Sequence, residues 1–175
     1  MASHWLSEIL KHVRPAFTQI LVVSAFVNLL AIAAPVRAEN PAPYPDTVMV
    51  ETGKPFEPFV EAFAKAITAN GFNVVGIACA NCAIKGVFGE TVPGNRVFLF
   101  FKPAYARRII AASVAAGIEA PIRVYATEAA DGTAHVTYRK PSGVFGAYEV
   151  PDLTAMGREL DDHVARMVAD ARAGS

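Results

Sequence analysis

The sequence has few of the residues that usually build metal centres, and it has no excess of either charge. It holds two cysteines and four histidines in 175 residues, and its 16 lysines and arginines balance 16 aspartates and glutamates. Leaving out Lys11, Arg14, Arg37 and Glu8 removes three cations and one anion, so the chain beyond Ala38 has a formal net charge of −2. Proteins that bind nucleic acid present a basic surface. The charge balance therefore argues against nucleic acid as a partner.

Several catalytic and cofactor motifs are also missing. No G-x-S-x-G segment presents a serine nucleophile, and Ala83 stands where covalent haem attachment would require the histidine of C-x-x-C-H. Beyond the N-terminal region, only His135 and His163 could join the two cysteines as zinc ligands. We expect His135 to face solvent on a strand and His163 to lie on the outer face of the last helix. Neither histidine is a favoured ligand.

One long segment has no charge at all. Residues 15–36 are apolar or uncharged, and Lys11 and Arg14 precede them, which is typical of an export signal or a membrane anchor. The run of 22 residues is long enough to span a bilayer, whereas the small residues Val36 and Ala38, at positions −3 and −1, suit cleavage by signal peptidase. We therefore predict that residues 1–38 are a signal peptide or a membrane anchor. Either outcome places the rest of the chain in the periplasm, free or held at the inner membrane through residues 15–36.

The N-terminal segment HWLSEILKHVRPAFTQILVVSAFVNLLAIAAP (4–35) is similar to the first membrane helix of type I secretion exporters. Nothing after it continues that family, because the chain has no second apolar span and no phosphate-binding G-x-x-x-x-G-K-[ST] loop. The resemblance implies only that this segment could stay in the membrane as an anchor.

The remaining chain follows the pattern of one α+β domain over 46–172, preceded by a Pro-rich linker at 39–45. Apolar alternation, helical spacing and turn residues predict the order β-α-β-β-α-β-β-α. This pattern is typical of a two-layer sandwich, one sheet with helices packed against it, preceded here by an N-terminal hydrophobic helix. The strands are expected at 46–51, 72–78, 96–101, 121–128 and 133–139, and the helices at 55–70, 103–117 and from 152 onward. We expect the strand at 96–101 to be buried on both faces, and 141–150 to be a loop.

Three segments of this domain resemble the bacterial and archaeal family called domain of unknown function 302. They are AITANGF (66–72), RVFLFFKPAYARRII (96–110) and APIRVYATEAADGTAHVTYRKPS (120–142). The resemblance implies a compact two-layer α+β fold that is often dimeric, and it implies no activity. Members often carry an acidic residue and a histidine after the second strand, where this chain has IACANCA (77–83). Another branch has cysteines where this chain reads FFKPAYA and APIRV, so functions tied to those groups do not transfer.

Cys79 and Cys82 are the residues that suggest specific chemistry, and they follow the expected second strand directly. In an exported protein a disulfide is the default state of such a pair. Thiol–disulfide exchange is one interpretation, with Cys79 as the attacking thiol, Cys82 as the resolving thiol and Pro121 as a cis proline beside the disulfide. Metal binding by Cys79 and Cys82 is another, with copper fitting two thiolates better than zinc does.

A third interpretation is a small ligand bound in a cleft near the cysteine pair. Its anionic group would meet one of four cations, namely Arg96, Lys102, Arg107 or Arg123. Our leading hypothesis is an exported, non-catalytic binding module for a soft metal or a small molecule near Cys79 and Cys82. The alternatives are a thiol–disulfide oxidoreductase and a structural domain that forms a homodimer.

Overall fold

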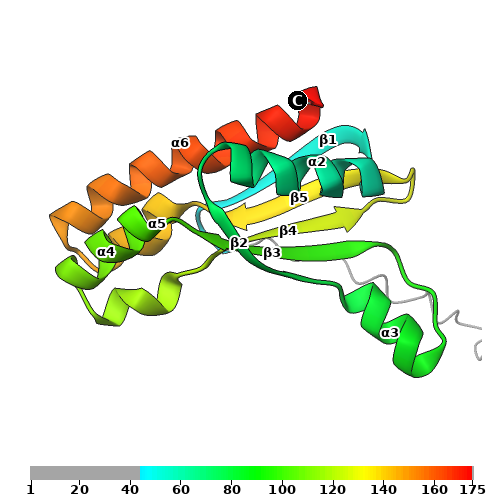
Figure 1. The fold of residues 1–175 in the computed structure, drawn as a ribbon, viewed down its shortest axis with the longest axis horizontal. Coiled ribbons are helices and arrows are strands. Elements are labelled where there is room, and N and C mark those ends of the chain that lie inside the picture. Colours follow the sequence, from blue (N-terminus) through cyan, green and yellow to red (C-terminus); the bar gives the residue numbers. More distant parts are fainter. Residues whose placement is uncertain (1–43, 175) are drawn as a thin grey trace, which may run out of the picture. The chain divides into compact units, whose positions relative to one another are not determined.

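A computed structural model describes residues 44–174, and the predicted leader at 1–38 lies outside these residues. Five antiparallel strands form one sheet in the order β1-β5-β4-β3-β2, and helices complete a mixed α+β fold (Figure 1). The strands are β1 (Thr47–Pro55), β2 (Asn73–Ala78), β3 (Asn95–Phe101), β4 (Ile122–Glu128) and β5 (Thr133–Arg139). The helices are α2 (Phe56–Ala69), α3 (Ala80–Phe88), α4 (Pro103–Ala112), the 3-10 helix η2 (Ala115–Glu119), α5 (Pro141–Gly146) and α6 (Pro151–Ala173).

Helices α2 and α6 lie side by side and cover one face of the sheet (Figure 1). In α2, apolar residues recur every three or four positions, so they share one face of the helix, and that face is buried. The long helix α6 buries a stripe of the same kind from Leu153 to Ala171. Both helices contribute to the core that also holds Phe98 and Phe100 of β3 and Val124 of β4.

The opposite face of the sheet carries apolar side chains that no described element covers. Met49 is 54% exposed, Val75 53% and Tyr125 41%. Along β3, Phe98 and Phe100 are buried whereas the alternate residues are only partly buried. The prediction that this strand is buried on both faces was therefore wrong: all the large helices lie on one side of the sheet, so the alternation of side chains leaves the other side open.

Two short helices differ from the predicted element order. Residues 80–88 form α3 between β2 and β3, and 141–146 form α5 in the stretch that was expected to be a loop. The helix expected at 103–117 ends earlier, at Ala112, and gives way to η2. The predicted order is thus incomplete, because it contains neither α3 nor α5.

The tight connections match their sequence signals. The turn between β4 and β5 contains Asp131-Gly132, with Gly132 at φ 80° and the Asp131 carboxylate accepting a hydrogen bond from the Thr133 amide at 2.9 Å. Helix α2 ends before Gly71, which adopts φ 77°. Within residues 44–174 no helix is both long enough and apolar enough to span a membrane.

Candidate functional site

The two cysteines lie at the N-terminus of α3, at the end of β2. They form a disulfide with their Cα atoms 5.3 Å apart, so the structure brings together the pair that the sequence singled out. Cys79 is the N-cap residue of α3, and its sulfur accepts a hydrogen bond from the Cys82 amide at 3.2 Å. Cys79 is half-buried, whereas Cys82 is exposed. The two sulfurs therefore have different surroundings.

Asparagine and arginine side chains hold the start of α3 against β3. Asn95 Oδ1 accepts hydrogen bonds from the amides of Ala80 and Asn81 at 3.0 and 3.2 Å. Asn81 Oδ1 in turn accepts from the Asn95 amide at 3.2 Å and from the Arg96 guanidinium at 2.7 Å, and it lies 3.1 Å from Cys79 Sγ. The cation of Arg96 is therefore one side chain away from the disulfide.

Arg96 is fixed in place by further contacts. Its guanidinium forms an ion pair with Glu57 at 3.0 Å and lies 5.5 Å from the centre of the Phe56 ring. Only 14% of the Arg96 side chain is exposed, against 63% for Glu57. Arg96 is thus a held charge at the cysteine end of the sheet, and its donors already have acceptors.

A metal site of several ligands finds no support among the described residues. Within 44–174, no three histidine, cysteine or acidic side chains lie close enough together to hold a metal ion. His135 pairs with Thr127 and Glu51 in the sheet, on the open face. Within the described residues, Cys79 and Cys82 therefore have no third histidine, cysteine or acidic ligand beside them.

His163 differs from its expected position on the outer face of α6. It packs between Phe72 and Tyr105, with ring centroids 5.2 and 5.8 Å away, and its Nδ1 is buried without a hydrogen-bond partner. Burial lowers the pKa of His163, and the nearby cations Lys102 and Arg166 lower it further. The expectation was wrong because helix α6 turns this residue towards α4 and the end of β3.

Pro121 follows a cis peptide bond, at Ala120-Pro121. The strand register nevertheless separates this proline from the cysteine pair. Ile122 pairs with Phe100, near one end of β3, whereas Ala78 pairs with Val97, near the other end. Pro121 and Cys79 are therefore at opposite ends of the strands, and the structure does not bring them together.

The four cations suggested as anion contacts also separate. Arg96 lies at the cysteine end, as described above, and Lys102 lies over the Phe72 ring at 5.4 Å. Arg107 is exposed on α4. Lys102 lines a small apolar pocket of about 10 Å³ beside Phe72 and Tyr105. Arg123 lines a larger pocket of about 80 Å³ at the Pro121 end of the sheet.

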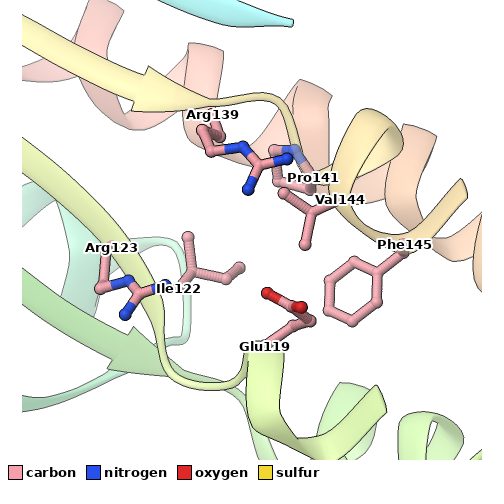
Figure 2. Close-up of a pocket in the computed structure, with 7 residues that line it drawn as sticks. All are labelled: Glu119, Ile122, Arg123, Arg139, Pro141, Val144 and Phe145. Carbon is pink, nitrogen blue, oxygen red and sulfur yellow. The ribbon is translucent and has the colours of Figure 1, made fainter. Parts of the chain in front are cut away.

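This pocket opens between β4, β5, η2 and α5 and has a volume of about 80 Å³. Figure 2 shows Arg123 and Arg139 on the two strands and Glu119 reaching into the space from η2. The apolar part of the wall consists of Ile122, Pro141, Val144 and Phe145. The pocket therefore combines two cations and one carboxylate with an apolar surface.

The pocket exists because β4 and β5 part at this end. Their register ends at Tyr125 and Thr137, although β4 begins at Ile122 and β5 continues to Arg139. Arg123 and Arg139 would be the next pair on the same face, two residues further along each strand. Each keeps a partner on its other side, Leu99 for Arg123 and Thr47 for Arg139, so both strands stay anchored as they separate.

In the pocket the carboxylate has a hydrogen-bond partner, whereas the two arginines have none among the described residues. Glu119 accepts a hydrogen bond from the Tyr148 hydroxyl at 3.2 Å, and burial and this contact raise the pKa of Tyr148. Among residues 44–174, ion pairs form at Arg96–Glu57 and Arg108–Glu159, and neither Arg123 nor Arg139 has a side-chain hydrogen bond there. The two cations of the pocket are thus open to a ligand.

Sequence reasoning included Arg123 but missed Arg139 and Glu119. Arg139 ends a strand that was predicted correctly, and its position opposite Arg123 follows once the hairpin register is counted from Asp131-Gly132. Glu119 could not have been found in this way, because the short helix that carries it was not predicted.

These features define the class of the protein: a small α+β domain with a five-stranded antiparallel sheet, a partly exposed disulfide at one end and a cationic pocket at the other. Residues 47–171 match the family described as "Domain of unknown function DUF302", and the chain belongs to this family. No curated protein matches the chain.

A solved structure has the same fold. The chain is similar to an uncharacterized conserved protein DUF302 from Bacillus stearothermophilus, with a TM-score of 0.65 and 14% sequence identity. The match covers 72% of this chain and 98% of the other. The family match confirms the predicted family, and this likeness confirms the α+β fold.

Proposed function

We propose that this domain is a binding module for a small organic anion, held in the pocket between β4 and β5. The observation that supports this proposal is the pair of arginines, Arg123 and Arg139, which face the same apolar hollow without a partner among the described residues. A binding module was the leading hypothesis from the sequence, but we place the ligand at the opposite end of the sheet from Cys79 and Cys82.

The two arginines are an unfavourable arrangement in the absence of an anion. Arg123 and Arg139 line one pocket where β4 and β5 separate, and two like charges placed this way repel each other. A carboxylate or phosphate between them would turn this repulsion into attraction, because each guanidinium offers parallel N–H donors that match two oxygen atoms. An anion is therefore the ligand chemistry that best relieves the local charge.

The remaining walls restrict the ligand further. A volume of about 80 Å³ suits a small group rather than a large cofactor. Phe145 and Val144 offer an apolar surface to a short hydrocarbon part, and Glu119 would accept a hydrogen bond from a hydroxyl or ammonium group of the ligand. We propose a small carboxylic acid as the ligand class.

The proposal is tested by titrating the purified full chain, in detergent, with butyrate, benzoate and inorganic phosphate. Butyramide and benzamide serve as uncharged counterparts of the same shape. A ligand that binds the native state raises the unfolding temperature as its concentration rises. We expect the carboxylates to do so and the amides to have no effect, as measured by calorimetry and by thermal unfolding.

Two arginine variants test the pocket, and a third serves as their matched control. Arg123→Gln and Arg139→Gln should each weaken carboxylate binding about tenfold or more, since each removes hydrogen bonds to a charged group. Arg107→Gln removes an exposed arginine of α4, outside the pocket, and should leave binding unchanged. Equal effects of all three variants, or equal binding of amides and carboxylates, would contradict the proposal.

Two further parts of the interpretation stay predictions. Export to the periplasm, with or without retention through residues 15–36, is supported by the sequence of the leader and by the cysteine pair. A homodimer is supported by the open apolar face of the sheet around Met49 and Tyr125. Cell fractionation tests the first, and sedimentation of the full chain tests the second.

A further inference from the structure

We propose a second activity at the other end of the sheet: the Cys79–Cys82 disulfide exchanges with protein dithiols, and the incoming thiolate attacks Cys82. This order is the reverse of the one that the sequence suggested, in which Cys79 reacts with the substrate. It is independent of the anion pocket, because the two sites lie at opposite ends of the strands.

The first argument is access. Cys82 is exposed, Cys79 is half-buried, and none of the residues of α3 is buried. Gly86 lies one helical turn beyond Cys82 and so on the same face. A Cβ atom added there would meet nothing within 4 Å outside the backbone of the helix itself, so this face of the helix is open at Gly86. Cys82 is therefore the more accessible of the two cysteines to an attacking thiolate.

The second argument is the fate of the displaced sulfur. Exchange is faster when the leaving thiol has a low pKa. The Cys82 amide donates to Cys79 Sγ at 3.2 Å, and this contact at a helix N-terminus stabilises a thiolate on Cys79. The Arg96 guanidinium donates to Asn81 Oδ1, which lies 3.1 Å from this sulfur, and so offsets the negative potential that this oxygen places beside a thiolate. Cys79 is therefore the better leaving group.

The reaction balances with a protein dithiol as the reductant. One substrate thiolate attacks Cys82 Sγ, the bond between Cys79 and Cys82 breaks, and its electron pair leaves on Cys79. The second substrate thiolate then attacks the substrate sulfur of the mixed disulfide and releases Cys82 as a thiolate. The substrate loses two electrons and two thiol protons and becomes a disulfide, and the domain becomes a dithiol. Once protonated, the Cys79 thiol can donate to Asn81 Oδ1, which lies 3.1 Å away.

The site of attack can be read directly. The oxidised full chain in detergent is mixed with reduced glutathione, quenched in acid within seconds, digested and analysed by tandem mass spectrometry. We expect glutathione on Cys82 at least about tenfold more often than on Cys79, since exposure decides which sulfur is attacked. Glutathione found mainly on Cys79, or a disulfide that neither glutathione nor a dithiol peptide opens, would overturn the proposal.

The role of Arg96 as a positioning residue has a separate readout. In the Cys82→Ser background, the pH dependence of Cys79 alkylation by iodoacetamide should shift to higher pH when Arg96→Gln is added. In the otherwise unchanged chain, Arg96→Gln should slow reduction of the disulfide roughly threefold. Arg108→Gln breaks the other ion pair among the described residues and should change neither quantity. An equal effect of Arg108→Gln, or no shift with Arg96→Gln, would remove Arg96 from the mechanism.

Discussion

Helices α3 and α5 are both short, and both border a candidate site, but they are held in opposite ways. Helix α3 has nine residues and none of them is buried, and Val87 and Phe88 near its end are 74% and 70% exposed. Helix α5 has six residues, and two of them, Pro141 and Phe145, are buried. Helix α3 is therefore held by the disulfide and the hydrogen bonds at its first turn, whereas α5 is held by the packing of its buried side chains.

The way in which each helix is held determines the kind of site that it can border. The bonds that hold α3 include a disulfide, so a change of redox state acts directly on this element. Helix α5 is fixed on α6: the Ser142 amide donates to Asp161 at 2.9 Å, and the two helices approach closely at Gly157. A rigid wall suits a binding pocket, whereas an element held by exchangeable bonds suits a reactive site.

Helices α3 and α5 each contain one phenylalanine, and replacing it should give the largest difference in the free energy of unfolding between the two helices. Phe145 is 1% exposed, and Phe145→Ala should lower the free energy of unfolding by about 3–5 kcal/mol, because it leaves a cavity in the core. Phe88→Ala should change it by less than about 0.5 kcal/mol. Urea denaturation of both variants measures the difference. Similar losses for both would show that α3 packs on a surface that the described fold does not contain.

Glycine substitutions give a smaller contrast of the same kind. A Cβ atom at Gly157 would lie 2.8 Å from the Ser142 Cα and 2.9 Å from the Pro141 carbonyl oxygen, which are both backbone atoms. Gly157→Ala should therefore destabilise the domain by about 1–3 kcal/mol through overpacking.

The matched control is Gly86→Ala in α3, where an added Cβ meets nothing within 4 Å. It should be neutral or slightly stabilising, since alanine favours a helix over glycine by about 0.5–1 kcal/mol. Both variants are compared by urea denaturation. If Gly86→Ala were destabilising and Gly157→Ala neutral, the conclusion that α3 is exposed and α5 is packed against α6 would be wrong.

The same contrast explains which elements the sequence could predict. Helices α2, α4 and α6 have apolar periodicity over several turns, and the strands have either alternation or a short apolar run, so the positions of these elements were predicted. Helix α5 carries Gly143 and Gly146 in six residues, so its local propensity is poor. It forms because α6 supplies Asp161 as a cap and Gly157 as space, and neither residue is near in sequence.

Helix α3 was missed for a different reason. Gly86 and Gly89 weaken the helical pattern after Cys82, but Asn95 caps the first turn from β3, and Gly89 closes the helix at φ 70°. The cysteine pair was recognised from its spacing alone. The pocket was not, because Arg123, Arg139 and Glu119 meet only when the hairpin register and an unpredicted 3-10 helix are known.

Removing the disulfide should have the most local effect. The bridge closes a very short loop, so its entropic contribution is about 2 kcal/mol at most. In Cys79→Ser/Cys82→Ser the serine at 79 keeps an N-cap acceptor, so the double variant isolates the covalent bond. Because α3 buries nothing, we expect amide hydrogen exchange at 80–88 to accelerate by up to about thirtyfold while the amides of α5 and α6 keep their rates. Hydrogen exchange with mass spectrometry measures both regions at once. If α5 and α6 accelerated together with α3, the disulfide would support the whole domain, and reduction by a substrate dithiol would then unfold the anion pocket as well.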